Sequence, residues 1–382
     1  MTHDPAFSHR LMSWRRHLHQ NPELGLEEHQ TAAFVAARLK ELGIEVTEGV
    51  GGTGVVGTIR RGGNRAVGLR ADMDALPIQE ISGVPHASRT PGVMHACGHD
   101  GHTTSLLGAA ELLARDTSWA GTVHLVFQPA EEGRGGAKAM LADGLFERFP
   151  MERIFGYHNW PGLPAGTIAV HDGPVMAMGG RLVIEIEGHA GHAALPHLTR
   201  DPIVAAGNLL VAIQTTVSRN IDPMNPSVVS IGMIQGGEAA NQIARQVTLR
   251  GTARALNDEV FSAIEESLER ICAGIAQAHG VRCKFTSTRG AALTRNTSAE
   301  ADMAAEAVES SGAALRRDLP AAMTGEDFGW MLAERPGAYV WIGNGPAENG
   351  VELHNPRYDY NDAILPVAAG WYAEVAKRAL RG

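Results

Sequence analysis

The run of residues 95–102 (HACGHDGH) places one thiol among three imidazoles. Cys97 and His99 are two residues apart, so their side chains point the same way only in an extended or looped backbone. Gly98 between them permits such a turn. A thiolate with a neutral imidazole is a suitable donor pair for Zn²⁺, whereas Mg²⁺ and Ca²⁺ prefer oxygen. The run therefore predicts a metal site, although a helix cap with additional histidines would also explain it.

Two other histidines of this run are expected to lie outside the ligand set. His102 is predicted to open the helix that follows. His95 is predicted to support the ligands from a second layer, because metal ligands need hydrogen-bonded neighbours that orient them.

The adjacent residues Glu131 and Glu132 offer the two carboxylates that a metal-dependent hydrolase needs. One carboxylate binds metal, and a free one takes a proton from the metal-bound water. Neighbouring residues in a loop point in different directions, so each can do one of these jobs. His158 and His354 could complete the ligand set. Taken singly, paired glutamates are more often a solvated face, and each histidine a buried, hydrogen-bonded side chain.

Polar residues later in the chain could contact a substrate. The segment 188–197 (GHAGHAALPH) is rich in Gly and Ala, whose small side chains let a ligand approach closely, and it displays His192. Arg250 and Arg254 are four apart on one predicted strand and therefore face the same side, with Asn241 in the loop before it. Together these residues could grip a carboxylate, although an ordinary polar strand face is the alternative.

The elements around the first candidates predict a sheet that gathers them at one edge. Strands are predicted at 54–59, 66–71, 122–128 and 154–158, and helices at 6–20, 28–42, 102–115 and near 137–142. Near-continuous apolar strands separated by helices indicate a parallel sheet covered on both faces. Asp72, Glu131 and His158 each come at the carboxyl end of such a strand, where open α/β sheets place their ligands.

A block with a different pattern interrupts this α/β region. Strands are predicted at 181–187, 227–235, 246–255 and 281–289, and helices at 201–219 and 258–279. The order β-α-β-β-α-β is that of a ferredoxin-like module. We therefore expect a large, mostly parallel α/β domain of residues 1–179 and 291–382, with an inserted ferredoxin-like domain of residues 180–290, for which the family resemblance described below implies the role of a lid and dimerisation domain.

Composition narrows the classes of protein. The 382 residues carry a formal charge of −9, which argues against nucleic acid as a partner, and no apolar run is long enough to cross a membrane. Residues 1–20 lack the apolar stretch of a signal peptide. The three cysteines predict no disulfide framework and fit a reducing compartment, so a cytoplasmic location is expected.

Eight motifs in order give the chain a family resemblance. They are residues 15–19 (RRHLH) with 22–24 (PEL), 69–77 (LRADMDALP), 94–100 (MHACGHD), 128–132 (QPAEE), 156–158 (GYH), 191–194 (GHAA), 324–328 (TGEDF) and 353–356 (LHNP). The chain resembles the dinuclear metallopeptidases that include aminoacylases and bacterial carboxypeptidases. It is most similar to their amidohydrolase branch of hippurate hydrolases, auxin-conjugate hydrolases and N-acetyl-diaminopimelate deacetylases. His189 departs from many relatives, which often have lysine there.

The resemblance implies a role for each candidate. The expected ligands of two divalent ions (Zn, Mn, Ni or Co) are Cys97, His99, Glu132, His158 and His354. Cys97 takes the bridging place that relatives outside this branch fill with aspartate. Glu131 is the expected general base and His192 the expected oxyanion donor, while Asn241 and Arg254 are the expected substrate contacts. A homo-oligomer, dimer or tetramer, is expected to form through the inserted domain.

The predicted reaction is hydrolysis of the amide bond of small N-acyl amino acids, hippurate-like or N-acetylated, by a metal-bound hydroxide. The products would be a carboxylic acid and a free amino acid. A di- or carboxypeptidase of the same family is the alternative within enzymes. A non-catalytic, metal-dependent binding protein is the alternative outside them, but it would not need the free carboxylate of Glu131.

Overall fold

The computed structural model describes residues 4–347 and 350–381 of the chain. The ends of the predicted catalytic domain, residues 1–3 and 382, lie outside the described residues, as do 348–349. The chain divides into two compact units. Unit 1 comprises Met1–Val175, Thr294–Pro320 and Asp327–Gly382, and unit 2 comprises Met176–Leu293 and Ala321–Glu326.

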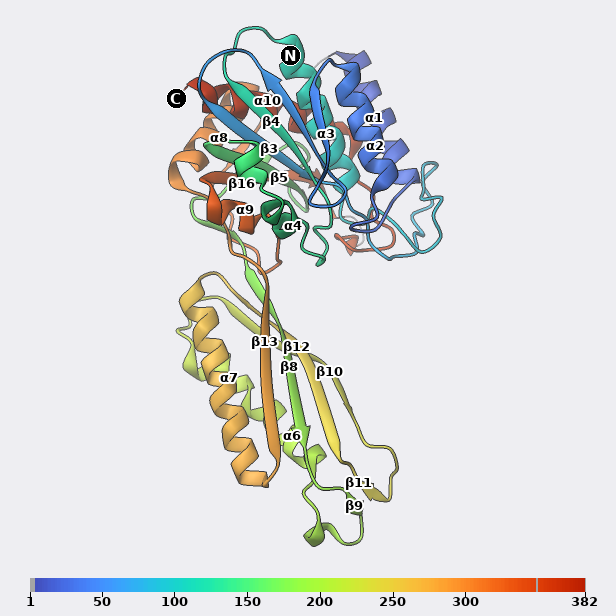
Figure 1. Cartoon of the computed structure of the whole chain (residues 1–382), viewed down its shortest axis with the longest axis vertical. Coiled ribbons are helices and arrows are strands. Elements are labelled where there is room, and N and C mark those ends of the chain that lie inside the picture. The colour runs from blue at the N-terminus through green and yellow to red at the C-terminus, as the bar shows by residue number, and fades with distance from the viewer. Residues whose placement is uncertain (1–3, 348–349, 382) are drawn as a thin grey trace. The chain divides into compact units, whose positions relative to one another are not determined.

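Unit 1 is built on an eight-stranded sheet in the order β1-β2-β4-β3-β5-β16-β6-β15 (Figure 1). The strands are β1 (Glu45–Val50), β2 (Gly54–Arg60), β3 (Ala66–Asp72), β4 (Thr122–Gln128), β5 (Arg153–Pro161), β6 (Ile168–Val170), β15 (Leu315–Arg316) and β16 (Gly337–Gly345). A separate short sheet pairs β7 (Pro174–Met176) with β14 (Thr294–Arg295).

The central strands β4, β3, β5 and β16 are parallel, which confirms the mostly parallel sheet. The sheet is mixed at its sides, because β2 runs antiparallel to β4 and β6 antiparallel to β16. The expectation that 54–59 joins the parallel set was therefore wrong. Its reason is the glycine turn at residues 51–53, which joins β1 to β2 as a tight antiparallel hairpin.

Helices complete the layers of unit 1. They are α1 (Pro5–Gln20), α2 (His29–Glu41), α3 (His99–Arg115), α4 (Gly136–Ala142), α5 (Leu145–Arg148), α8 (Ser298–Ser311), α9 (Gly329–Glu334) and α10 (Leu365–Arg381). Leu69, Leu125 and Phe155, from three parallel strands, belong to one buried cluster with apolar residues of α1, α2, α3, α8 and α10. This apolar core fixes the sheet and therefore the ends of its strands.

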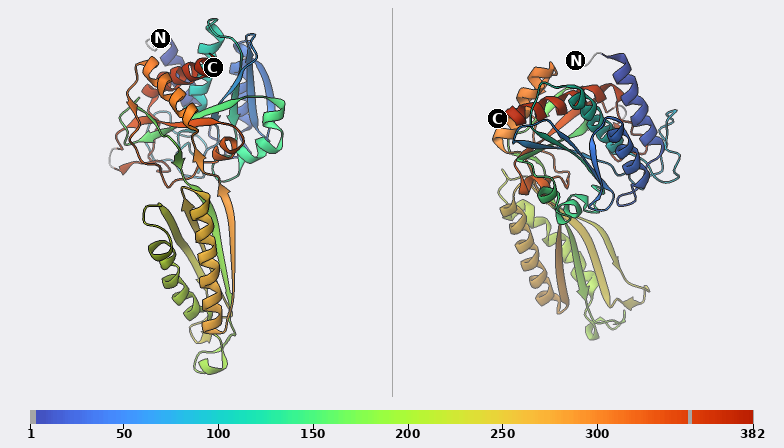
Figure 2. Two further views of the ribbon diagram at one scale, coloured as in Figure 1. Left: turned by 90° about the vertical axis from the view of Figure 1, so that its left-hand side faces the viewer. Right: turned by 45° about the horizontal axis from the view of Figure 1, so that its top comes forward.

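Unit 2 is a four-stranded antiparallel sheet, β10-β12-β8-β13, with two helices. In chain order the elements are β8 (Met178–Glu187), α6 (Pro202–Ala212), β10 (Ser227–Gly236), β12 (Gln246–Ala255), α7 (Asp258–His279) and β13 (Arg282–Ala291). Two short strands, β9 (Gly191–His192) and β11 (Gln242–Ile243), pair with each other. Figure 2 shows α6 and α7 side by side over the sheet, and their apolar residues share its core.

The helix predicted over 201–219 is shorter than expected. α6 ends at Ala212, and a single π turn follows at Thr216–Asn220. The hydroxyl of Thr215 donates to the carbonyl of Ala212 at 2.7 Å, and that of Ser218 to the carbonyl of Gln214 at 2.9 Å. Such side-chain bonds to the backbone compete with regular helix geometry, which explains the early end.

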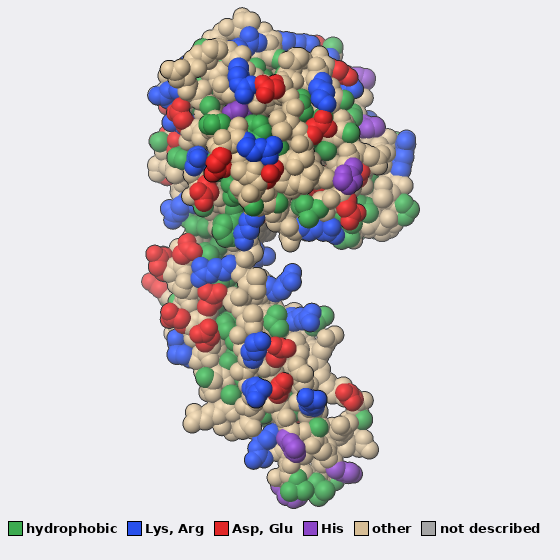
Figure 3. All heavy atoms as spheres, viewed as in Figure 1, with side chains coloured by type: hydrophobic (Ala, Val, Ile, Leu, Met, Phe, Trp, Pro, Cys, Tyr) green, Lys and Arg blue, Asp and Glu red, His purple; other side chains and the backbone are tan. Residues whose placement is uncertain are grey.

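Within residues 4–347 and 350–381, no helix is both long and apolar enough to span a bilayer. On the face drawn in Figure 3, basic and acidic side chains are interspersed over both units, so this face carries mixed charge.

Candidate metal centre

The candidate ligands of unit 1 gather at the carboxyl ends of its parallel strands. Asp72 ends β3, Glu131 and Glu132 lie in the turn after β4, and Cys97 comes shortly before α3. His158 was expected to end its strand, but β5 continues to Pro161. The longer pairing with β16 extends β5 beyond His158, so this imidazole projects from the sheet itself.

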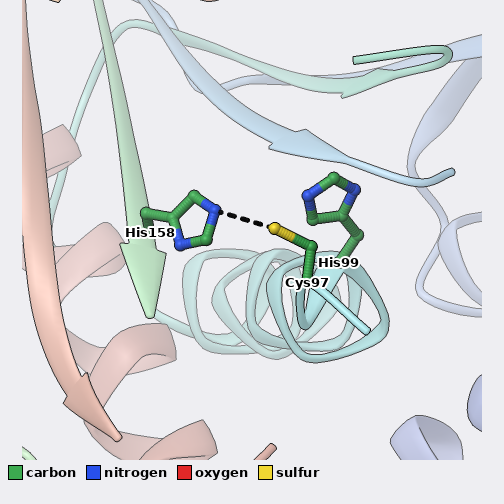
Figure 4. A group of neighbouring side chains, drawn as sticks. All are labelled: Cys97, His99 and His158. Carbon is green, nitrogen blue, oxygen red and sulfur yellow. Dashed lines mark hydrogen bonds between the residues drawn. The ribbon is translucent and has the colours of Figure 1, made fainter. Parts of the chain in front are cut away.

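The first group of donors is Cys97, His99 and His158, all buried (Figure 4). Their donor atoms lie within 4.8 Å of one another. Cys97 Sγ is 3.4 Å from His158 Nε2. The His158 ring is held from its other side, since Nδ1 lies 2.7 Å from the Asn159 carbonyl oxygen. Nε2 of His158 is therefore the nitrogen presented to the thiol.

Cys97 belongs to a second group as well, with Glu132 and His354, whose donor atoms also lie within 4.8 Å of one another. His354 Nε2 is 3.1 Å from Glu132 Oε1. A further group joins His99 to Glu131 and Glu132. The structure thus brings all five predicted ligands and the predicted base together, with Cys97 common to two groups.

The chemistry of this set fits divalent metal ions. His99 Nε2 is buried and has no hydrogen-bond partner in the described part of the chain, and it lies 3.8 Å from Asp72 Oδ2. Its Nδ1 is occupied, at 3.0 Å from the carbonyl oxygen of Asp74. Burying an unpaired ring nitrogen is unfavourable unless another group binds it. Thiolate, imidazole and carboxylate donors together suit Zn²⁺ and its transition-metal neighbours.

Burial and neighbouring groups shift the pKa values of three of the candidate ligands. Burial, and then the carboxylate of Glu132, raise the pKa of the Cys97 thiol. Hydrogen bonds with Cys97 and then Glu132 raise the pKa of His354 to about 10. Burial, followed by the neighbouring His102, lowers the pKa of His158 well below its usual range. Burial and the neighbouring carboxylate therefore disfavour a thiolate at Cys97 in the absence of a cation, while His158 remains a neutral donor.

Asp74 supports the donors, a role that the sequence interpretation did not assign to it. Its Oδ2 accepts the backbone N–H of Glu132 at 2.9 Å, and its Oδ1 lies 3.2 Å from His99 Nδ1. One buried carboxylate thus orients two candidate ligands. Its position two residues after Asp72, just beyond β3, was the available signal.

The prediction for His102 was wrong, because α3 begins at His99. Gly98 takes a φ of +89° and turns the chain immediately before the helix. His102 therefore lies one turn inside α3, with Nδ1 2.6 Å from Asp72 Oδ1 and Nε2 2.6 Å from Asn159 Oδ1. It ties the end of β3 to β5.

His95 is fully buried, and neither of its ring nitrogens has a hydrogen-bond partner among the described residues. Its ring lies 6.4 Å from that of His19. Burial lowers the pKa of His95 to about 4. A supporting role toward the ligands stays a prediction.

The residues expected to contact substrate all belong to unit 2. His192, on β9, is exposed, and the N–H of Ala193 donates to the Asn241 carbonyl at 3.0 Å, so these segments are neighbours. Arg254 is half-buried on β12, and its guanidinium rests where side chains at Gly179 and Gly325 would otherwise lie. Within the described residues the side chain of Arg254 has no hydrogen bond or ion pair, although its backbone pairs with Gly179 and Val228 in the sheet.

Asn241 and the arginines were expected to bind one carboxylate together, but Asn241 and Arg254 are too far apart to do so within one copy of unit 2. β12 begins at Gln246, near the β9–β11 pair, and Arg254 pairs with Gly179 close to its other end. Eight residues of strand at roughly 3.3 Å each separate these positions. Asn241 and Arg254 of one copy therefore cannot hold the same carboxylate.

A parallel sheet with thiolate, imidazole and carboxylate donors at its carboxyl ends, and one more carboxylate beside them, defines a class: hydrolases that work with bound divalent metal. A family model described as "Peptidase family M20/M25/M40" matches residues 68–378. The chain belongs to this family and is a hydrolase.

Relatives cover nearly the whole chain. A hippurate hydrolase of Campylobacter jejuni is 44% identical over 373 residues, covering 96% of each chain. An N-acetylcysteine deacetylase of Bacillus subtilis is 39% identical over 378 residues, covering 98% of this chain and 97% of its own. Among solved structures, a dinuclear metal-binding peptidase of the M20 family from Bacillus subtilis superposes with a TM-score of 0.88 at 36% identity, covering 99% of each chain.

Proposed function

We propose that this enzyme hydrolyses the amide bond of small N-acyl amino acids with two divalent ions, releasing a carboxylic acid and an amino acid. The observation that carries the proposal is the sharing of Cys97 between two donor groups, with Glu131 next to them. The names of two relatives, a hippurate hydrolase and an N-acetylcysteine deacetylase, support this substrate class.

In this proposal Cys97 would be a ligand common to both ions, one of which would also be held by His99 and His158 and the other by Glu132 and His354. Zn, Mn, Ni and Co all suit these donors. Bound ions supply Lewis acidity, which polarises a carbonyl and lowers the pKa of water. The dinuclear title of the solved relative supports the pair of ions.

Glu131 is the proposed general base. Its carboxylate is half-buried beside His99 and Glu132, and its Oε1 accepts the N–H of Asp327 at 3.3 Å. That bond helps to hold the side chain in place. Glu131 would take the proton of the attacking water and deliver it to the leaving nitrogen, so that the amine departs neutral.

Unit 2 is the proposed ferredoxin-like lid and dimerisation domain. His192 would donate to the oxyanion, and Asn241 and Arg254 would contact the substrate. Because β12 separates Asn241 from Arg254, we propose that the two residues serve different sites in a homo-oligomer. The three cysteines, all free thiols, support the cytoplasm as the place of action.

Glu131→Gln, assayed on N-acetyl, N-benzoyl and dipeptide substrates, tests the proposal. The substitution keeps the shape of the side chain and removes its basicity, so we expect full metal content and kcat lowered by about 1,000-fold or more. The wild-type enzyme should prefer N-acyl amino acids to dipeptides. Wild-type turnover by the variant would contradict the mechanism, and a preference for dipeptides would make the enzyme a peptidase.

A further inference from the structure

Glu28 is a fully buried carboxylate at an unusual place, the residue directly before α2. Side chains at this position commonly accept a backbone N–H of the helix, yet Glu28 makes no such bond. Glu23 does this instead, accepting the N–H groups of Gln30 at 3.1 Å and Thr31 at 2.9 Å. The start of α2 is therefore held without the side chain of Glu28.

Both oxygens of Glu28 turn inward and each accepts one hydrogen bond. Oε1 accepts the backbone N–H of Ala130 at 2.8 Å, and Oε2 accepts the hydroxyl of Thr53 at 2.5 Å. Thr53 is itself buried, in the turn between β1 and β2. Burying a carboxylate is costly unless it is well paired, so this arrangement needs a reason beyond filling space.

Ala130 is the residue immediately before Glu131 and Glu132, and its backbone is strained. Its φ is +53°, a left-handed conformation that alanine rarely adopts. Its carbonyl accepts the N–H of Gly136 at 3.0 Å. Gly25 leaves room for it, because a Cβ at Gly25 would lie 2.9 Å from Ala130 Cα. Strain of this kind persists only where the surroundings enforce it.

Two carboxylates thus hold the backbone on either side of Glu131. Glu28 binds the N–H of Ala130, and Asp74 binds the N–H of Glu132 at 2.9 Å. Asp74 lies among the candidate ligands, whereas Glu28 reaches the loop from the position before α2, 102 positions earlier in the chain than Ala130. A change at Glu28 would therefore act on the glutamates only through the backbone of Ala130.

We propose that Glu28 is a positioning residue, which holds Ala130 in its left-handed conformation and thereby aims the carboxylates of Glu131 and Glu132. This inference rests on the proposed function, in which Glu131 is the base and Glu132 a ligand. In this role Glu28 acts through its two hydrogen bonds and contacts neither substrate nor metal.

Substitutions of Glu28 test the role by separating its hydrogen bonds from its charge. Glu28→Gln can still accept from Ala130 with its oxygen while its amide donates to Thr53, so kcat should stay within about threefold of wild type. Glu28→Ala loses both bonds, and kcat should fall by about 10- to 100-fold with little change in KM, as misplaced catalytic groups do. Two ions per chain should still bind at saturating metal, but with lower affinity, because Glu132 is a proposed ligand.

Glu23→Ala is the matched control, since it removes a glutamate that serves only the start of α2. It should lower Tm about as much as Glu28→Ala does and leave kcat nearly unchanged. Adding Ala130→Gly to Glu28→Ala should recover part of kcat, because glycine adopts positive φ without help. Wild-type kcat in Glu28→Ala, or equal losses in Glu28→Gln and Glu28→Ala, would overturn the proposal.

Substitutions of Thr53 test the proposal independently in case Glu28→Ala does not fold. Thr53→Ala removes one of the two bonds to Glu28 and should lower kcat several-fold, whereas Thr53→Ser keeps the hydroxyl and should restore it. Equal kcat in these two variants would contradict the proposal. Glu131→Gln, run alongside, separates the two failures: its activity would contradict the assigned base, whereas its inactivity beside a fully active Glu28→Ala would contradict only the role of Glu28.

Discussion

Cys97 lies where two groups of donors meet, so its substitution should affect both at once. Cys97→Ala should bind fewer than two ions per chain and lose nearly all turnover, because the Cys97 thiolate would be a ligand of both ions. Elemental analysis after gel filtration measures the ions. Cys272→Ala, another buried cysteine but one in α7, should keep both the ions and activity. Two tightly bound ions in Cys97→Ala would contradict the bridge.

The residue types at the site were predictable because their chemistry is local. Cys97, His99 and the pair Glu131–Glu132 stand in short motifs whose donors suit a metal, and the structure brings them together. Asp74 was given no role, because its place just beyond β3 does not by itself separate an orienting carboxylate from a solvated one. The role proposed for Glu28 was equally hidden, since it depends on a strained backbone 102 residues away.

Gly98 links the turn that carries Cys97 to the start of α3. A Cβ on Gly98 would lie 2.5 Å from Asn159 Oδ1, the atom that His102 Nε2 contacts at 2.6 Å. The φ of +89° adds strain for any residue with a side chain. Gly98→Ala should therefore lower the free energy of unfolding by roughly 2 kcal/mol or more.

Urea unfolding followed by circular dichroism measures this effect. Gly274→Ala is the matched control, because Gly274 is inside α7 with nothing within 4 Å of its added Cβ. That substitution should stabilise the protein by about 0.5–1 kcal/mol through helix propensity. Equal stability of Gly98→Ala and the wild type would show that Asn159 and His102 adjust freely.

Elements with strong periodicity were predicted well, and those fixed by their partners were not. The predicted bounds 122–128 and 258–279 are those of β4 and α7. The hairpin strand β1 was missed because half of its residues are exposed, among them Glu45 and Glu48, so its apolar pattern is weak. The early start of α3 depends on Gly98, whose positive φ a sequence pattern does not disclose.

Unit 2 has large apolar side chains that stay exposed among the described residues. Ile203, Val204 and Val211 are exposed on α6, and Met233 and Ile234 on the edge strand β10. Apolar residues beside an unpaired strand edge favour association with another copy. This supports the proposed homo-oligomer.

Val204→Glu should shift the enzyme toward the monomer, because it places a charge among the exposed apolar side chains of α6. Light scattering after gel filtration measures the mass. Ile81→Glu, an exposed site of similar character in unit 1, should leave the mass unchanged. A monomeric wild type at micromolar concentration would contradict the prediction.

A reconstitution titration tests most directly whether the activity of the enzyme depends on bound metal. Chelator-treated enzyme, freed of chelator and dialysed against metal-free buffer, should hydrolyse an N-acyl amino acid at a negligible rate. Stepwise addition of Mn²⁺ or Zn²⁺ should restore turnover, with activity reaching its plateau at two ions per chain. Full turnover by the metal-free protein, or a plateau at one ion per chain, would contradict the dinuclear site assigned to Cys97 and its neighbours.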